Sequence, residues 1–490
     1  MRVPHLAAAL AVLALCQPGA AGARKLGTLE FKPCDLQQQF QTRVFEAQCA
    51  YLEVPENPDA PAGRKIALRI ALVESTAARP QPDPVFFLAG GPGQSALESY
   101  PSVAAGFRRV LQQRHVILVD QRGTGGSHKL ECKYEGGGDK GVAEEVAAPE
   151  RFAERLRACL ATIDGDPSHY TTEDAVRDLD QVRQAIGAER INLVGGSYGT
   201  RFAQHYLRRH PEHTRSVVLD GVVPPELALG ADHAVNLQST LDAIAERCAR
   251  QPSCREAFGD MRETLRELRA RVVKDPREYA IRDPQSALAL RQRFDLEALV
   301  TVARIFAYAP ETAALLPFSL NEALAGRPEV LLEQARLISS GLGEQITHGL
   351  ELSVICAEDA DLIGNRPEAA DTLMGPDFGT MINAGCAVWP KGARAPDFHD
   401  PVRSDVPVLI LSGEFDPVTP PRYGDQVAKG LSRSRHLVAK GQGHIVMQRG
   451  CAPRLVGEFI KSADATKLDA SCLDELGDTP LFVTANGWEP

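Results

Sequence analysis

A serine flanked by glycines is the residue of this chain best placed to do chemistry. Residues 195–199 read Gly-Gly-Ser-Tyr-Gly and place Ser197 in a Gly-x-Ser-x-Gly pattern. An apolar run at 191–194 precedes it, and a helical pattern at 201–207 follows it. Between a strand and a helix, this pattern is typical of a nucleophile elbow, a sharp turn that raises the serine hydroxyl above a sheet edge. Because short motifs recur by chance, the alternative is a glycine-rich turn with an incidental serine.

The serine needs partners, because its hydroxyl is a poor nucleophile at neutral pH. It requires a base to accept its proton and a carboxylate to orient that base. Asp416 and His444 follow Ser197 in a chain order that one class of serine hydrolases uses. Taken singly, Asp416 before Pro417 could be only a turn former, and His444 could be structural. Since all three follow expected strands, we expect them at one edge of one sheet, as a catalytic triad.

Acyl transfer also creates an oxyanion, which needs two fixed N–H donors. The backbone N–H of Tyr198, directly after the nucleophile, is the first expected donor. The second should come from the loop after an early strand. Residues 90–93 (Gly-Gly-Pro-Gly) follow the apolar run 85–88, and we expect Gly91 to be this donor. The alternative is a plain Gly-Pro-Gly turn.

The elements that must position these residues alternate between strands and helices. Expected strands lie at 85–88, 116–119, 191–194, 216–220, 407–411 and 435–439. Their apolar runs and glycine-rich ends are typical of a parallel sheet buried on both faces. Residues 171–187 have helical spacing and begin with a capping box. The fold class predicted is therefore α/β, a mostly parallel sheet flanked by helices, preceded by extended and hairpin structure at 28–75.

With 490 residues, the chain exceeds one ordinary domain. Residues 226–400 interrupt the alternation and are rich in Ala, Leu, Glu and Arg. Helical spacing recurs there at 238–250, 256–273, 295–308 and 328–341. We expect a large helical cap insertion at 226–400. The core would then comprise 24–225 and 401–475, followed by a tail at 476–490.

The first 23 residues have the pattern of a secretory signal peptide. Arg2 gives a positive start, 6–15 is apolar but too short to span a bilayer, and 21–23 offer an Ala-Gly-Ala cleavage site. Export to a bacterial periplasm or full secretion fits equally well. Cys16 leaves lipid anchoring as a minor alternative, although Leu15 is bulky where lipoprotein signals have a small residue.

The other ten cysteines suit an oxidising compartment. Consecutive pairing would give the disulfides Cys34–Cys49, Cys132–Cys159, Cys248–Cys254, Cys356–Cys386 and Cys451–Cys472. Other pairings and free buried thiols are the alternatives. We expect no metal and no cofactor, because no metal-ligand spacing occurs. With a net charge of −10 and no later apolar run long enough for a bilayer, neither nucleic acid nor stable membrane insertion is expected.

Five motifs together resemble the proline iminopeptidase and tripeptidyl aminopeptidase group of α/β-hydrolases, which are secreted serine exopeptidases. These motifs lie at 90–95, 120–127, 195–200, 413–420 and 441–444. The resemblance implies Ser197 as nucleophile, Asp416 as orienting acid and His444 as base. It also implies cleavage of peptides from a free N-terminus through an acyl-enzyme. Ala89 stands where proline iminopeptidases usually have His, and Tyr198 where they commonly have Trp, so the tripeptidyl aminopeptidase branch fits better.

Recognition of a free α-amine calls for a carboxylate in a dry pocket. Glu358 and Asp359, held beside Cys356, are the candidates, with an acidic surface loop as the alternative. A carboxylesterase or other small-molecule hydrolase would share the triad. A non-catalytic binding module would be expected to lack one of its members. The sequence leaves open whether one or three residues are released, the preferred side chains and the oligomeric state.

Overall fold

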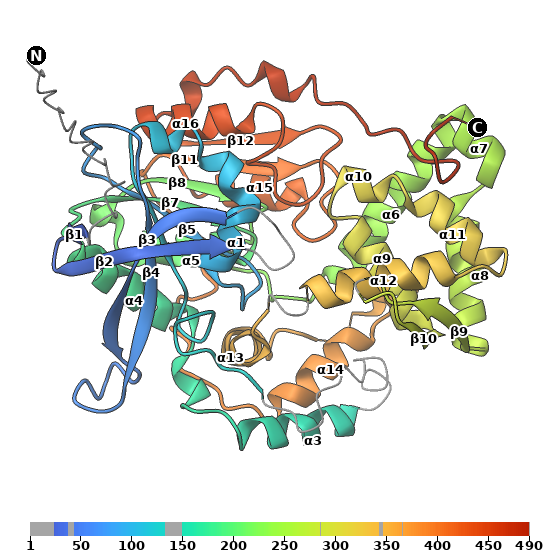
Figure 1. The fold of residues 1–490 in the computed structure, drawn as a ribbon, viewed down its shortest axis with the longest axis horizontal. Coiled ribbons are helices and arrows are strands. Elements are labelled where there is room, and N and C mark those ends of the chain that lie inside the picture. Colours follow the sequence, from blue (N-terminus) through green and yellow to red (C-terminus); the bar gives the residue numbers. More distant parts are fainter. Residues whose placement is uncertain are drawn as a thin grey trace, which may run out of the picture.

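A ten-stranded sheet forms the centre of the molecule in the computed structural model, which describes residues 24–37, 44–132, 149–284, 286–342, 346–364 and 366–489 (Figure 1). The strand order is β1-β2-β3-β4-β6-β5-β7-β8-β11-β12. Pairing is antiparallel from β1 to β4 and between β4 and β6, and parallel across the rest. This arrangement confirms the expected α/β architecture with helices flanking the sheet.

The strands of the sheet are β1 (Arg24–Leu26), β2 (Leu29–Gln37), β3 (Val44–Pro55), β4 (Lys65–Val73), β5 (Val85–Leu88), β6 (Val116–Val119), β7 (Ile191–Gly196), β8 (Thr214–Asp220), β11 (Val408–Gly413) and β12 (Ser434–Ala439). Every residue of β5, β6, β7 and β11 is buried. This explains their continuous apolar runs, because helices cover both faces there. The antiparallel strand β2 instead alternates between buried and exposed residues along much of its length.

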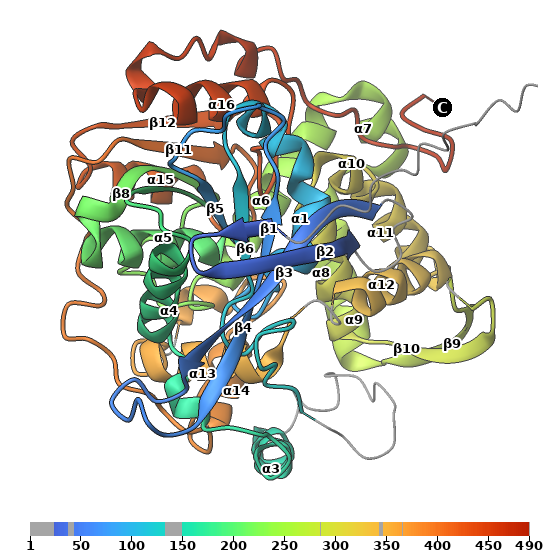
Figure 2. The ribbon, with the colours of Figure 1, turned by 60° about the vertical axis from the view of Figure 1, so that its left-hand side comes forward.

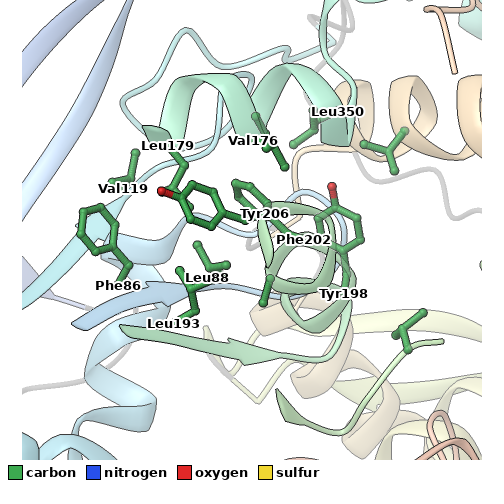
Figure 3. Packing of buried hydrophobic residues seen from close by; sticks show 14 of the residues in the cluster. Phe86, Leu88, Val119, Val176, Leu179, Leu193, Tyr198, Phe202, Tyr206 and Leu350 are labelled. Carbon is green, nitrogen blue, oxygen red and sulfur yellow. The ribbon is translucent and has the colours of Figure 1, made fainter. Parts of the chain in front are cut away.

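Two groups of helices cover the sheet. The core helices are α1 (Ala96–Val103), α3 (Pro149–Leu160), α4 (Thr172–Ala185), α5 (Tyr198–Arg209), α15 (Pro421–Ala428) and α16 (Ala452–Ser462). One apolar cluster contains residues of α4, α5 and α15, and a second contains residues of α1 and α16. Figure 3 shows the first cluster, where Phe86 and Leu193 from the sheet face Val176 of α4 and Phe202 of α5. The expected capping box begins α4, with Thr171 and Asp174 each bonded to the other's backbone.

Nine helices lie between β8 and β11 in the described part of the chain. They are α6 (His233–Arg250), α7 (Pro252–Phe258), α8 (Met261–Lys274), α9 (Leu296–Phe306), α10 (Pro310–Ala313), α11 (Leu316–Leu324), α12 (Glu329–Leu342), α13 (His348–Glu358) and α14 (Asp377–Cys386). The single helix expected at 256–273 is two helices, because Gly259 adopts a φ of +69° and breaks the chain direction. An antiparallel pair, β9 (Arg277–Arg282) and β10 (Ala289–Phe294), was not expected.

These nine helices pack in two ways. Helices α6 to α12 build an apolar cluster of their own, which Leu481 and Val483 of the C-terminal tail complete. Helices α13 and α14 instead pack with α3 and the cluster over the sheet (Figures 1 and 2). A division of the chain into core and cap at 226 and 400 therefore stays a prediction.

The ten cysteines beyond the signal segment lie in five disulfides in this structure. They are Cys34–Cys49, Cys132–Cys159, Cys248–Cys254, Cys356–Cys386 and Cys451–Cys472. The expected signal peptide at 1–23, with Cys16, lies outside the described residues. Within those residues, no helix is both long and apolar enough to cross a bilayer.

Candidate active site

Ser197 occupies a strained turn between β7 and α5. Its backbone has φ 54° and ψ −126°, a conformation costly for any residue except glycine. The flanking glycines permit the turn, because a Cβ on Gly195 would overlap the carbonyl oxygen of Gly199, and one on Gly199 would overlap that of Leu88. The Ser197 N–H donates to the Asp220 carbonyl oxygen at 2.9 Å, which fixes the turn to the end of β8. The side chain is thus presented beyond the carboxyl ends of the parallel strands.

Asp416 and His444 meet at that same edge. The distance from His444 Nδ1 to Asp416 Oδ2 is 2.7 Å. The backbone N–H groups of Val418 and Thr419 each donate to Asp416 Oδ1 at 2.8 Å, and the Thr419 hydroxyl donates to Oδ2. The Asp416 side chain is completely buried. A carboxylate held by so many donors keeps one orientation and fixes the histidine ring that it contacts.

The electrostatics of this pair favour an imidazolium next to a carboxylate. Burial alone would raise the pKa of Asp416, but the attraction of His444 and the N–H donors outweigh it, and the pKa is lowered. Burial likewise opposes the charged form of His444, yet the Asp416 carboxylate raises the pKa of the histidine above its usual value. The pair therefore stabilises the positive charge that a general base acquires.

Several loops converge on these residues. A Cβ on Gly90, after β5, would lie 3.0 Å from Ser197 Cβ, and one on Gly221, after β8, would lie 2.9 Å from His444 Cε1. Among the described residues, the Ser197 hydroxyl has no hydrogen-bond partner. Catalytic hydrogen bonds are often long in an unliganded enzyme and shorten when substrate binds. The same edge of the sheet therefore carries a half-buried Ser197 hydroxyl, which has no partner within the described residues, and a buried Asp–His pair.

The expected oxyanion donors border the elbow. Tyr198 is the first residue of α5, where backbone N–H groups lack intrahelical acceptors and the helix dipole favours negative charge. Gly91 follows Gly90 with a φ of +102°. Within the described part of the chain, neither N–H donates to a backbone carbonyl. The assignment of these two N–H groups as oxyanion donors stays a prediction that this geometry permits.

Three further residues stabilise the loops of this site, and no sequence motif indicated their role. The backbone N–H of His444 donates to the Tyr308 carbonyl at 2.8 Å, and the two rings lie edge to face at 5.3 Å. Thr347 donates its N–H to the Gly93 carbonyl at 2.9 Å, next to the Gly91 loop. The Asp220 carboxyl group accepts the N–H groups of Val446 and Met447, just beyond His444, and burial raises the pKa of Asp220 to about 6. Tyr308 and Thr347 come from the segment after β8, where no motif marked them.

Glu358 and Asp359 are both buried, and each contacts donor groups of the protein. The Glu358 carboxyl group accepts the Thr172 N–H at 2.6 Å and the Thr172 hydroxyl at 2.9 Å. Asp359 forms an ion pair of 2.8 Å with Arg201, one turn after the elbow, and both side chains are fully buried. Asp359 Oδ1 accepts no hydrogen bond within the described residues, so a role of this carboxylate pair as ligands of a substrate amine stays a prediction.

The chain is similar in sequence to several known proteins. Residues 83–448 match the family model described as the alpha/beta hydrolase fold. The chain is 25% identical over 488 residues to "Serine protease Hip1" of Mycobacterium tuberculosis (strain ATCC 25618 / H37Rv), covering 91% of this chain and 92% of that protein. It is 25% identical over 464 residues to "Tripeptidyl aminopeptidase" of Streptomyces coelicolor, covering 87% and 83%. It is 31% identical over 229 residues to "Carboxylesterase B" of M. tuberculosis (strain CDC 1551 / Oshkosh), covering 44% of each.

Proposed function

The chain belongs to the alpha/beta hydrolase fold family, and we propose that it is an exported serine peptidase that cleaves peptides from a free N-terminus. The single observation that carries the proposal is the 2.7 Å contact between His444 Nδ1 and Asp416 Oδ2, beside the strained turn at Ser197. The names of two relatives, serine protease Hip1 and tripeptidyl aminopeptidase, support a peptide substrate. The five disulfides and the signal-like pattern at 1–23 support export.

In the proposed reaction, His444 Nε2 takes the proton of the Ser197 hydroxyl as Oγ attacks a peptide carbonyl carbon. Asp416 keeps the ring oriented and stabilises the imidazolium. The N–H groups of Tyr198 and Gly91 bind the resulting oxyanion. The imidazolium gives its proton to the leaving amine as the C–N bond breaks. Water then attacks the acyl-enzyme by the same proton transfers, which releases the N-terminal fragment and restores Ser197.

Three substrates with one sequence test the proposal: a free-amine peptide anilide, its N-acetylated form and the corresponding short ester. We expect the free-amine anilide to be cleaved much faster than the acetylated one. Mass spectrometry of products from an unblocked peptide library would then read whether one residue or three are released. Ser197→Ala should lose nearly all turnover while folding normally, and peptidase activity retained in that variant would refute the mechanism.

A carboxylesterase is the second candidate, which the 31% identity to a relative named Carboxylesterase B favours over 229 residues. It would hydrolyse the ester efficiently and ignore both anilides. A non-catalytic hydrolase-like module would act on none of the three substrates. It would also fail to react at Ser197 with a fluorophosphonate, a reagent that phosphonylates activated serines. The same panel therefore separates the three possibilities.

A further inference from the structure

The hydroxyl group of Tyr198 belongs to a buried chain of hydrogen bonds that leads away from the elbow. Tyr198 Oη lies 2.7 Å from Thr172 Oγ1 and 3.2 Å from Gln121 Nε2. Thr172 Oγ1 donates to Glu358 Oε2 at 2.9 Å, and the Thr172 N–H donates to Oε1 at 2.6 Å. Tyr198 and Thr172 are completely shielded from solvent, and Glu358 is 1% exposed. Bonds in such surroundings are costly to leave unmade.

In this series of hydrogen bonds, every group donates to the next in one direction, from Gln121 toward Glu358. Thr172 donates its hydroxyl proton to Glu358 Oε2, an oxygen that can accept whether or not the other carboxyl oxygen is protonated, so the Thr172 oxygen accepts the proton of Tyr198. The Tyr198 oxygen accepts in turn from the Gln121 amide, which is a donor. Each hydroxyl therefore donates once and accepts once. Removal of the Thr172 hydroxyl would leave the Tyr198 proton without its acceptor.

This series of hydrogen bonds joins segments that are distant in sequence. Gln121 lies in the loop after β6, Tyr198 begins α5, Thr172 begins α4 and Glu358 ends α13. Figure 3 shows the Tyr198 ring rising from α5 toward Leu350 of α13, away from the sheet residues Leu88 and Leu193. The Glu358 carboxyl group also lies at the N-terminus of α4, where the helix dipole favours negative charge. The Cys356–Cys386 disulfide ties the end of α13 to α14.

We propose that Thr172 and Glu358 are positioning residues for catalysis: through the Tyr198 hydroxyl they fix the backbone N–H that binds the oxyanion beside Ser197. This rests on the proposed function of Ser197. The ring and the donor N–H belong to the same residue, so a ring bonded at its far end restrains the start of α5. A donor of this kind must be placed to a fraction of an ångström, since a small misplacement of catalytic groups costs much of the rate. The segment after β8 thereby contributes to the oxyanion site through Glu358.

The test compares four single variants for ester and peptide hydrolysis. Tyr198→Phe and Thr172→Val remove one hydroxyl each and keep the shape of the side chain, and we expect both to lower kcat by about ten- to a hundredfold with KM little changed. Thr172→Ser retains the hydroxyl and should recover most of the rate. Tyr206→Phe is the matched control. It removes another buried hydroxyl of α5, which donates to Asp180 Oδ1 at 3.0 Å, outside the chain.

Thermal unfolding of all four variants separates positioning from stability. If Tyr198→Phe and Tyr206→Phe lose similar stability but only the former loses kcat, the positioning role stands. A kcat equal to that of the wild type in Tyr198→Phe and Thr172→Val, or an equal loss in Tyr206→Phe, overturns it. The rate of fluorophosphonate labelling at Ser197 shows which of the two proposals, the function or the positioning role, a negative result contradicts. Wild type that does not label at Ser197 refutes the proposed function, whereas equal labelling of wild type, Tyr198→Phe and Thr172→Val refutes the positioning role alone.

Discussion

Asp416 Oδ2 and His444 Nδ1 are 2.7 Å apart although 28 residues separate them in the chain. Their loops follow β11 and β12, which pair in parallel so that Gly413 stands opposite Ala439. Adjacent parallel strands end at the same edge, and a loop of a few residues on each is enough to bring the side chains together. The sheet register thus determines the contact on which the proposed chemistry depends.

Asp416→Asn should lower kcat by about 10⁴-fold, because an amide no longer holds the reactive tautomer of His444 or stabilises its charge. The variant should also move the acidic limb of the pH–rate profile to lower pH. Asp416 raises the pKa of His444, so its removal lets the neutral base persist in more acidic solution. A profile of kcat/KM against pH measures both effects. An unchanged acidic limb would assign that limb to another group.

Gly443→Ala should damage the site through the Tyr308 contact. The added methyl group would overlap the Tyr308 carbonyl oxygen, which also accepts the His444 N–H. We expect a loss of about 1–3 kcal/mol in the free energy of unfolding and a kcat lowered by about a hundredfold. Gly364→Ala is the control, since no atom of the described residues beyond its chain neighbours lies within 4 Å of the added Cβ there. Equal kcat in both variants would show that the Tyr308 contact is dispensable.

Arg201→Met should destabilise the fold by about 3–5 kcal/mol, because it leaves the Asp359 carboxylate buried without its partner. Removal of that charge as well, in Arg201→Met with Asp359→Leu, should recover part of the loss. Denaturant unfolding of the two single variants and the double variant gives the coupling energy. If the losses of the two single variants simply add in the double variant, Arg201 and Asp359 do not stabilise each other.

Glu358→Gln should change how stability depends on pH. Burial raises the pKa of Glu358 from 4.5 to about 8, helped by Asp359 and opposed by Arg201. Between these values the native state holds a proton that the unfolded chain has lost, so the free energy of unfolding falls as pH rises. The variant should flatten this fall between pH 5 and pH 8 in denaturant titrations. Glu368→Gln alters an exposed carboxylate and should leave the slope as it is; a wild-type slope in Glu358→Gln would contradict the assignment.

The strands next to the site were predictable because burial on both faces leaves a continuous apolar run. Residues 85–88 and 116–119 coincide with β5 and β6, and the expected strand 191–194 lies within β7. The order of the strands was not predictable, since it depends on pairing between distant segments. The pair β9 and β10 was missed because its residues are largely exposed and charged, so they leave no apolar run.

Within the candidate site, residues in glycine-rich loops after strands were visible, and residues outside such loops were not. Ser197, Asp416 and His444 carried the signal of chain order. Thr172 belongs to the predicted capping box, but nothing in its local pattern indicates that its hydroxyl faces Tyr198. Glu358 was expected in a dry pocket beside Cys356, but no pattern indicated that its carboxyl group would contact Thr172. Its burial depends on α13 packing against the start of α4, which no local pattern records.

The five disulfides have a consequence for biogenesis. Each joins a cysteine to the next one along the chain, with separations of 15, 27, 6, 30 and 21 residues. A chain that crosses a membrane from its N-terminus would deliver these cysteines two at a time, each with its partner arriving next. Simple oxidation in order of arrival then yields the native connectivity, and no bond has to be broken and reshuffled. If the protein is exported in this way, we expect its disulfides to require an oxidant in that compartment and no disulfide isomerase.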